Sequence, residues 1–216
     1  DWCGHFPLEH FQGKQVSIRV SGAPKEVIDL IRQSDRIPGQ ENFYREAHRP
    51  QFHFTARTGW LNDPNGLIYH EGRYHMYFQH NPFSVQWGNM TWGHAVSKDL
   101  IHWEEQPAVL FPDAQGTCFS GASFIDRRNQ LGLKTGDEDV MVAFYLRTRI
   151  GLSYACSNDG GFSFTEYPGN PVLTREGARI DTPRPFWHEP TRRWIAPTYD
   201  FFINEEGKKL RCVGIY

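Results

Sequence analysis

A short segment near residue 60 combines side-chain types that could do chemistry on a polar substrate. Residues 59–66 read Gly-Trp-Leu-Asn-Asp-Pro-Asn-Gly, so the Asp63 carboxylate lies between two amides and follows an aromatic ring. A carboxylate can act as a nucleophile, side-chain amides can hold hydroxyl groups, and aromatic rings can pack on sugar rings. The same residues also suit a β-turn, because proline fixes φ and glycine accepts a positive φ. The motif alone therefore leaves a functional site and a plain turn as alternatives.

A second polar and aromatic cluster soon follows and favours the functional interpretation. Residues 77–82 read Tyr-Phe-Gln-His-Asn-Pro, residues 87–88 read Trp-Gly, and residues 92–94 read Trp-Gly-His. The histidines show no spacing typical of a zinc site, and the cysteines are far apart without a Cys-x-x-Cys pair. We therefore expect no metal ion and no cofactor.

The composition excludes several classes of function. The chain has 216 residues with 23 Lys and Arg against 25 Asp and Glu, so its net charge of -2 attracts neither nucleic acid nor an anionic membrane. No apolar run approaches the roughly 20 residues that a membrane-spanning helix needs. Aromatic residues make up 15% of the chain, beside 20 Gly and 14 Pro, which is typical of a β-rich domain with many tight turns.

The elements that must position these clusters repeat along the chain with a period of about 60 residues, typical of β-propeller blades. Ser97 and Asp99 recur as Ser157 and Asp159, and residues 213–216 resemble the strand that arrives at the same turn for a third time. A hairpin precedes each copy, and we interpret the Ser-x-Asp element as a structural turn. The period favours a propeller over the alternative, a β-sandwich.

The first forty residues differ from this repeat. Val16, Ile18 and Val20 alternate as in a strand, and residues 24–33 place their aliphatic side chains on one helical face. Because so short a segment makes no stable domain, we expect residues 1–42 to be the tail of a preceding module plus a linker. Residues 43–216 are then the N-terminal part of a β-propeller domain. The chain begins with neither methionine nor a signal peptide, so we expect it to start within a longer gene product.

Several motifs together make the sequence recognisable. They are residues 60–66 (Trp-Leu-Asn-Asp-Pro-Asn-Gly), 78–82 (Phe-Gln-His-Asn-Pro), 92–95 (Trp-Gly-His-Ala), 119–121 (Phe-Ser-Gly) and 186–188 (Phe-Trp-His), with Ser97, Asp99, Leu100, His102 and Trp103 between them. In this order they resemble glycoside hydrolase family 32, which contains invertases, inulinases, levanases and fructosyltransferases. The resemblance implies an all-β, five-bladed β-propeller of which this chain holds the first two to three blades, with an axial pocket for a β-D-fructofuranosyl unit.

The resemblance also implies roles for single residues. Asp63 is the expected nucleophile of a retaining reaction, which needs two carboxyl groups about 5 Å apart. The residues expected to bind the substrate are Asn62, Pro64, Asn65, Gln79, Trp87, Phe119, Ser120 and Thr182.

One segment departs from the family pattern. Where a third, stabilising carboxylate is expected in an Arg-Asp-Pro motif, this chain has Asp181-Thr182-Pro183. Either Arg179 and Asp181 take the usual roles after a shift by one residue, or the carboxylate is displaced. A one-residue slip in a regular strand would turn Asp181 to the other face, so only a bulge or a loop there preserves its role.

The resemblance places the general acid/base, a Glu in a Glu-Cys motif, beyond residue 216. Glu189 is no substitute, because it is expected at a hairpin tip. The leading hypothesis is a secreted or periplasmic β-fructosidase acting on levan, inulin or sucrose. The alternatives are a fructosyltransferase, a non-catalytic fructan-binding propeller and, least favoured by residues 60–66, an arabinofuranosidase.

Overall fold

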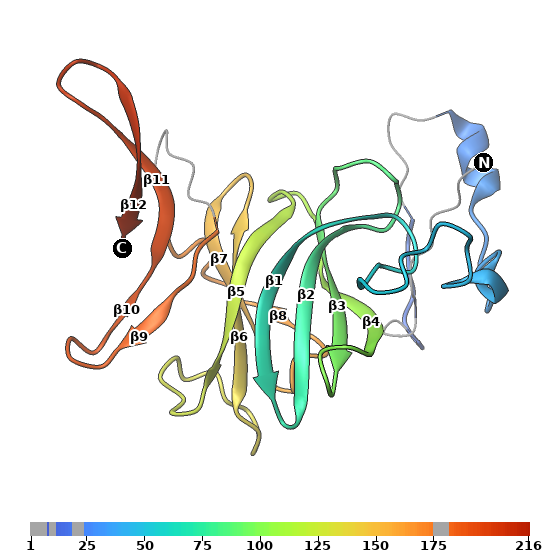
Figure 1. Cartoon of the computed structure of the whole chain (residues 1–216), viewed down its shortest axis with the longest axis horizontal. Helices are drawn as coiled ribbons and strands as arrows, with labels where there is room; N and C mark the ends of the chain where they lie inside the picture. The colour runs from blue at the N-terminus through green and yellow to red at the C-terminus, as the bar shows by residue number, and fades with distance from the viewer. Residues whose placement is uncertain (1–7, 9–11, 19–23, 175–181) are drawn as a thin grey trace.

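The computed structural model describes residues 8, 12–18, 24–174 and 182–216, and this part of the chain is built almost entirely of β-strands (Figure 1). Among these residues, no helix is long and apolar enough to cross a membrane. The elements are η2 (Lys25–Leu30), η3 (Gln40–Asn42), β1 (Trp60–His70), β2 (Arg73–Asn81), β3 (Thr91–Ser97), β4 (Trp103–Leu110), β5 (Cys118–Asp126), β6 (Val140–Arg147), β7 (Gly151–Ser157), β8 (Thr165–Glu166), β9 (Phe186–His188), β10 (Arg193–Ile195), β11 (Pro197–Ile203) and β12 (Lys209–Ile215).

Two four-stranded antiparallel sheets form the centre of the molecule. Blade 1 has the strand order β1-β2-β3-β4 and blade 2 the order β5-β6-β7-β8. Each is a meander, and the β1–β2 hairpin closes at Glu71 and Gly72, whose φ angles of 47° and 79° suit a tight hairpin turn. The two blades lie side by side with their first strands, β1 and β5, next to each other (Figure 1).

The Ser-x-Asp turns end the third strand of each blade, as predicted. In blade 2, Asp159 accepts hydrogen bonds from the backbone N–H groups of Phe162 and Ser163, and the Ser157 hydroxyl donates to its carboxylate at 2.6 Å. In blade 1, Asp99 likewise accepts from backbone N–H groups of the turn, at 2.8 and 2.9 Å. These carboxylates satisfy backbone donors that no strand partner reaches, which confirms the structural interpretation of the repeated motif.

Strands β9 to β12 form a third unit that repeats the start of a blade. The hairpin β9–β10 and the hairpin β11–β12 are joined through Ala196, which exchanges hydrogen bonds with the backbone of Tyr216. Strands β10 and β11 together thus take the place that β6 occupies in blade 2, and β12 takes the place of β7. The predicted third copy is therefore present.

Apolar cores lie between the units. Tyr77 and Trp92 of blade 1 pack with Met141 and Tyr145 of blade 2. On the opposite face of blade 2, Phe124 contacts Trp194 of the third unit, with 4.4 Å between the ring centroids. Successive sheets thus bury each other's faces, as propeller blades do.

The N-terminal segment differs from the sequence-based expectation. Val16 and Ile18 are not part of a strand, and Val20 lies outside the described residues. The predicted helix is found only as the six-residue 3₁₀ helix η2, in which no residue is buried. Ile28 and Leu30 of its apolar face are exposed, and a helix this short is marginal without packing. The proposed boundary at residue 42 stays a prediction.

A buried histidine pair stabilises the contact between blades 1 and 2. His75 Nδ1 lies 3.1 Å from His94 Nε2, and the His94 ring stacks on Tyr77 while meeting Phe162 of blade 2 edge-on. Burial, with the neighbouring His70 and Arg73, lowers the pKa of His75 to about 4. Burial, with the neighbouring His75, lowers the pKa of His94 to about 3. Both rings are therefore neutral in the folded protein at neutral pH.

This pair predicts that acid destabilises the fold. Since the pKa of each histidine is lower in the folded than in the unfolded state, the unfolded state binds more protons, and stability falls as pH drops below about 6.5 toward about 4. We expect His94→Phe, which keeps the ring but cannot titrate, to lessen the loss of melting temperature between pH 7 and pH 5. Exposed His48→Gln is the control, and an unchanged pH dependence in His94→Phe would contradict this origin.

Candidate active site

The predicted nucleophile lies in a β-bulge at the start of blade 1. Asn62 pairs with Gln79 and Pro64 with Phe78, so Asp63 has no partner on β2 and is exposed. A bulge of this kind re-aims a side chain out of the regular alternation. Residues 62–66 lie within β1, so the turn alternative is wrong.

The sequence itself explains why the strand is irregular here. Pro64 has no N–H to offer to a ladder and is tolerated because β1 is an edge strand in its sheet. Gly66 has φ 52° and marks a second irregularity between Asn65 and Ile68. A Cβ atom on Gly66 would lie 2.5 Å from Ser123 Oγ of blade 2, so only glycine lets β1 and β5 approach this closely.

A matching bulge in blade 2 brings a hydroxyl to Asp63. Cys118 pairs with Arg147 and Gly121 with Tyr145, which leaves Phe119 and Ser120 opposite a single residue of β6. The Ser120 hydroxyl donates a hydrogen bond to Asp63 Oδ2 at 2.8 Å. The two residues are 57 positions apart, and the structure brings them together at the adjoining first strands of the two blades.

Hydrogen bonds to the charged form keep Asp63 ionised. The Ser120 hydroxyl, and more weakly the Asn62 amide and the Asp63 backbone, hold the pKa of this carboxyl below its ordinary value, although partial burial opposes them. Trp60 Nε1 donates to Asn62 Oδ1 at 2.7 Å. Because an indole N–H can only donate, this bond turns the NH₂ end of Asn62 toward other acceptors. Asp63 is thus an exposed, ionised carboxylate beside an oriented amide.

Two of the residues predicted to bind the substrate, Gln79 and Asn65, are buried in the structure. Gln79 is buried, and its Nε2 donates to the Cys118 carbonyl at 2.9 Å, which ties β2 to β5. Asn65 is also buried, and neither end of its amide has a hydrogen-bond partner within the described part of the chain. Gln79 thus joins the two blades, and both side chains are buried, whereas Asp63 and Pro64 are exposed. Their roles in binding stay predictions.

Aromatic residues flank the carboxylate. Trp87 is exposed, and its ring meets Phe119 edge-on with 5.8 Å between centroids. Phe119 directly precedes Ser120, and its carbonyl accepts a hydrogen bond from Trp92 Nε1 at 3.0 Å. The predicted residues Asp63, Trp87, Phe119 and Ser120 are therefore linked by direct contacts.

Only part of the segment that departs from the family pattern lies among the described residues. Asp181 and Arg179 lie outside the described residues. Thr182 is exposed with φ 45°, a conformation that β-branched residues rarely adopt, and regular pairing begins only at Phe186. The irregular backbone that the proposed role of Asp181 requires is thus present from Thr182 onward, and the role itself stays a prediction.

Glu189 lies at the tip of the β9–β10 hairpin, as predicted. It pairs with Arg128 at 3.0 Å and accepts a hydrogen bond from Trp187 Nε1 at 2.6 Å. These bonds lower the pKa of its carboxyl. A carboxyl that is held ionised is poorly suited to donate a proton.

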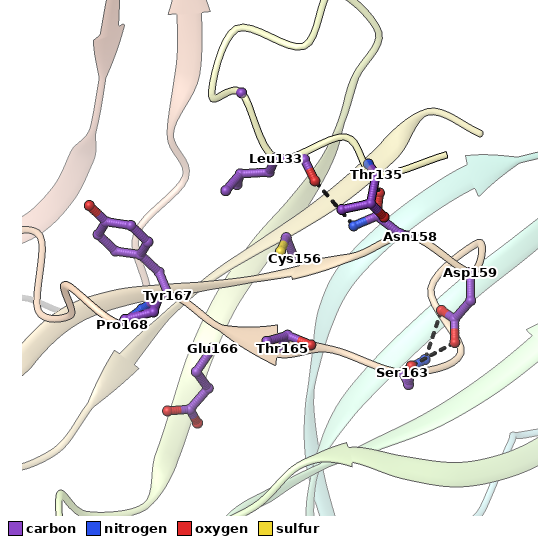
Figure 2. A pocket seen from close by; sticks show the side chains of 11 residues that line it. Leu133, Thr135, Cys156, Asn158, Asp159, Ser163, Thr165, Glu166, Tyr167 and Pro168 are labelled. Carbon is purple, nitrogen blue, oxygen red and sulfur yellow. Dashed lines mark hydrogen bonds between the residues drawn. The ribbon is translucent and has the colours of Figure 1, made fainter. Parts of the chain in front are cut away.

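Two clefts lie elsewhere. Figure 2 shows one of about 550 Å³ on blade 2, between Leu133, Cys156 and Tyr167. In the 60-residue repeat, Cys156 of blade 2 corresponds to Val96 of blade 1. Val96 lies on the same face of its strand as His94, and blade 2 covers this face through Phe162. We therefore assign this cleft to packing between blades. The other, of about 590 Å³, surrounds residues 44–55. None of the predicted site residues that the structure describes lines either cleft. The described residues contain no cluster of His, Cys, Asp and Glu suited to a metal ion.

Comparison with known proteins places the site in context. Residues 53–198 match the model of the glycosyl hydrolases family 32 N-terminal domain. The levanase of Bacillus subtilis (strain 168) is 46% identical over 158 residues, which cover 71% of this chain and 23% of the levanase. The invertase of Schizosaccharomyces pombe is 39% identical over 165 residues, which cover 71% of this chain and 28% of the invertase.

Solved structures give the same result. The exo-inulinase from Aspergillus awamori superposes with a TM-score of 0.64 at 30% identity over 80% of this chain and 40% of the inulinase. The β-fructofuranosidase from Schwanniomyces occidentalis, complexed with fructosyl-erythritol, gives 0.62 at 31% identity, over 78% and 36% of the two chains. The likeness confirms the predicted fold, part of a five-bladed β-propeller. The chain spans less than half the length of each of these relatives.

Proposed function

Because the chain belongs to glycoside hydrolase family 32, we propose that the protein hydrolyses terminal β-D-fructofuranosyl bonds with retention of configuration, with Asp63 as the nucleophile. The observation that carries this proposal is the exposed Asp63 carboxylate, raised from β1 by a bulge and bonded to Ser120 at 2.8 Å. A nucleophilic carboxylate must be ionised and accessible, and Asp63 is both.

The reaction proceeds in two displacements. Asp63 attacks the anomeric carbon of the fructosyl unit, the bond to the leaving oxygen breaks, and a second carboxyl group protonates that oxygen. Water then attacks the anomeric carbon of the fructosyl–Asp63 ester from the opposite side and gives its proton to that second carboxyl group, now a carboxylate. The bond to Asp63 breaks, which restores the Asp63 carboxylate and the original configuration. To the NH₂ end of Asn62 and the ring of Trp87 we assign the holding of the fructosyl unit during both steps. The bond that orients Asn62 and the contact of Trp87 with Phe119 support this assignment.

The substrates that we propose are levan, inulin and sucrose, and we propose that the protein is secreted. Relatives named levanase, invertase and exo-inulinase support the substrate class. A relative named as an extracellular exo-inulinase supports secretion.

A substrate panel tests the proposed activity. The full-length gene product is incubated with levan, inulin, sucrose and an aryl α-L-arabinofuranoside, and released sugars are quantified. NMR recorded in the first minutes identifies the anomer that forms first. We expect fructose from at least one of the first three substrates, released as the β-anomer. Binding of levan oligosaccharides without release would support the non-catalytic alternative, and transfer of fructose to another sugar in place of water would support a fructosyltransferase.

The Ser120 hydroxyl predicts a shift in the pH profile. Because Ser120 lowers the pKa of Asp63 by bonding its charged form, Ser120→Ala raises that pKa. The acid limb of kcat/KM then moves to higher pH, and activity falls most at low pH. The measurement is fructose release between pH 3 and pH 7.

Ser163→Ala is the matched control. Its hydroxyl also donates to a carboxylate, that of Asp159 at 2.6 Å, but in the turn of blade 2 away from Asp63. We expect its pH profile to equal that of the parent. An equal loss at every pH in Ser120→Ala would mean that Ser120 acts without changing the ionisation of Asp63.

A further inference from the structure

The loop between β2 and β3 carries apolar side chains that the reaction at Asp63 alone does not require. Phe83 and Val85 are 37% and 67% exposed, and Trp87 follows at the same spacing with 58% exposed. Residues 82–88 read Pro-Phe-Ser-Val-Gln-Trp-Gly and contain no charged residue. Exposed apolar side chains that gather on one segment are typical of a binding surface.

The buried side chain of Asn81 fixes the first part of the loop through two hydrogen bonds. Asn81 Nδ2 donates to the Gln86 carbonyl at 3.0 Å, and Asn81 Oδ1 accepts from the Phe83 N–H at 3.2 Å. The Ser84 hydroxyl also accepts from the Gln86 N–H at 3.1 Å. A surface that is ordered in advance loses little entropy when it binds a ligand.

Two contacts link the loop to the residues around the Asp63 carboxylate. The loop begins beside Gly59, where an added Cβ atom would lie 3.1 Å from Pro82 Cα. It ends at Trp87, which packs on Phe119, and Phe119 is the neighbour of the Ser120 that bonds Asp63. Phe83 and Val85 therefore lie on the stretch that joins these two contacts.

The direction of the nucleophilic attack determines which part of the substrate lies near the loop between β2 and β3. A nucleophile attacks the anomeric carbon from the side opposite to the leaving group. The leaving group therefore lies on the side of the fructosyl unit away from the exposed Asp63, where it points out of the site. We propose that Phe83 and Val85 contact the first sugar of the leaving group and that this sugar is a fructosyl unit of a fructan.

The chemistry of the loop fits such a ring. A fructofuranosyl unit is neutral and presents C–H groups on its ring and exocyclic carbons, which an aromatic ring and a branched aliphatic side chain can cover. The uncharged loop offers nothing to a phosphorylated leaving group. The proposal rests on the proposed hydrolysis and adds to it the preference for a fructan over sucrose.

The experiment compares leaving groups of different size. The full-length gene product and its Phe83→Ser/Val85→Ser variant are assayed on levan-type and inulin-type fructotrioses, on sucrose and on methyl β-D-fructofuranoside. We expect the variant to lose about tenfold in kcat/KM on at least one fructotriose, mostly through KM, while the methyl fructoside changes by less than about twofold. Ile101→Ser, which also removes an exposed apolar side chain but at the other end of β3, is the control.

The outcomes separate the two proposals. An equal loss on the methyl fructoside, or no loss on either fructotriose, would overturn the assignment of Phe83 and Val85 to the leaving group. A loss on sucrose as large as that on the fructotrioses would overturn the preference for fructan. If the parent protein releases no fructose from any substrate, including the methyl fructoside, the hydrolysis itself is wrong.

Discussion

Asp63→Asn lowers fructose release from the full-length gene product by about 10⁴-fold or more, because an amide cannot form the covalent intermediate. The change is nearly isosteric, so the bulge in β1 and the contact with Ser120 persist. Substrate binding is expected to remain, since Asn62 and Trp87 are unchanged. The measurement is fructose release together with calorimetric binding of a fructan oligosaccharide.

A second variant separates a nucleophile from a residue that merely supports the site. In Asp63→Ala, the space left by the carboxylate admits azide, which can attack the anomeric carbon directly. One displacement in place of two gives fructosyl azide with inverted configuration, and turnover returns as azide is added. Exposed Asp137→Asn is the control for loss of a carboxylate and keeps full activity. Retained fructose release in Asp63→Asn would contradict the assigned nucleophile.

Much of the fold could be predicted from local signals. The hairpin before the first Ser-x-Asp copy, the turns at Asp99 and Asp159, and the third copy of the repeat all follow from turn chemistry and periodicity. The structure confirms them. The apolar stripe of residues 24–33 predicted a packed helix that the structure does not contain, because periodicity indicates a face that could be buried and does not supply a partner for it. In the structure Ile28 and Leu30 are exposed.

The site was predictable as a set of residues but not as a geometry. Asp63 and Ser120 were both expected at the pocket, yet the hydrogen bond between them depends on two bulges on strands of different blades. Asn62 and Pro64 lie beside the first bulge, and both suit a turn as well as a bulge. The reason is the same in both cases, because both structures interrupt the regular pairing of a strand. Which side chain becomes buried, as Asn65 and Gln79 do, depends on the fit of two sheets.

No motif or spacing singles out Arg147, although it is central to the packing of blade 2. It lies in β6 among aliphatic neighbours, where strand periodicity predicts an apolar side chain, and it is 1% exposed. Its guanidinium donates to the carbonyls of Phe111 and Gly116 at 2.9 and 3.2 Å and pairs with Asp113 and Glu166. One buried cation therefore joins the connection between the blades to the sheet of blade 2.

Arg147→Met is therefore expected to destabilise the protein by about 3–5 kcal/mol, since the carboxylates and carbonyls around it lose their buried cation. For a domain of this size that corresponds to a fall in melting temperature of roughly 6–20 °C, measured on the full-length protein by calorimetry. Arg128→Met is the matched control, because Arg128 pairs with Glu189 in the open and its side chain is 70% exposed. Solvent screens such a pair, so its loss changes the melting temperature far less. Equal effects of the two substitutions would mean that the buried network is no more stabilising than a surface ion pair.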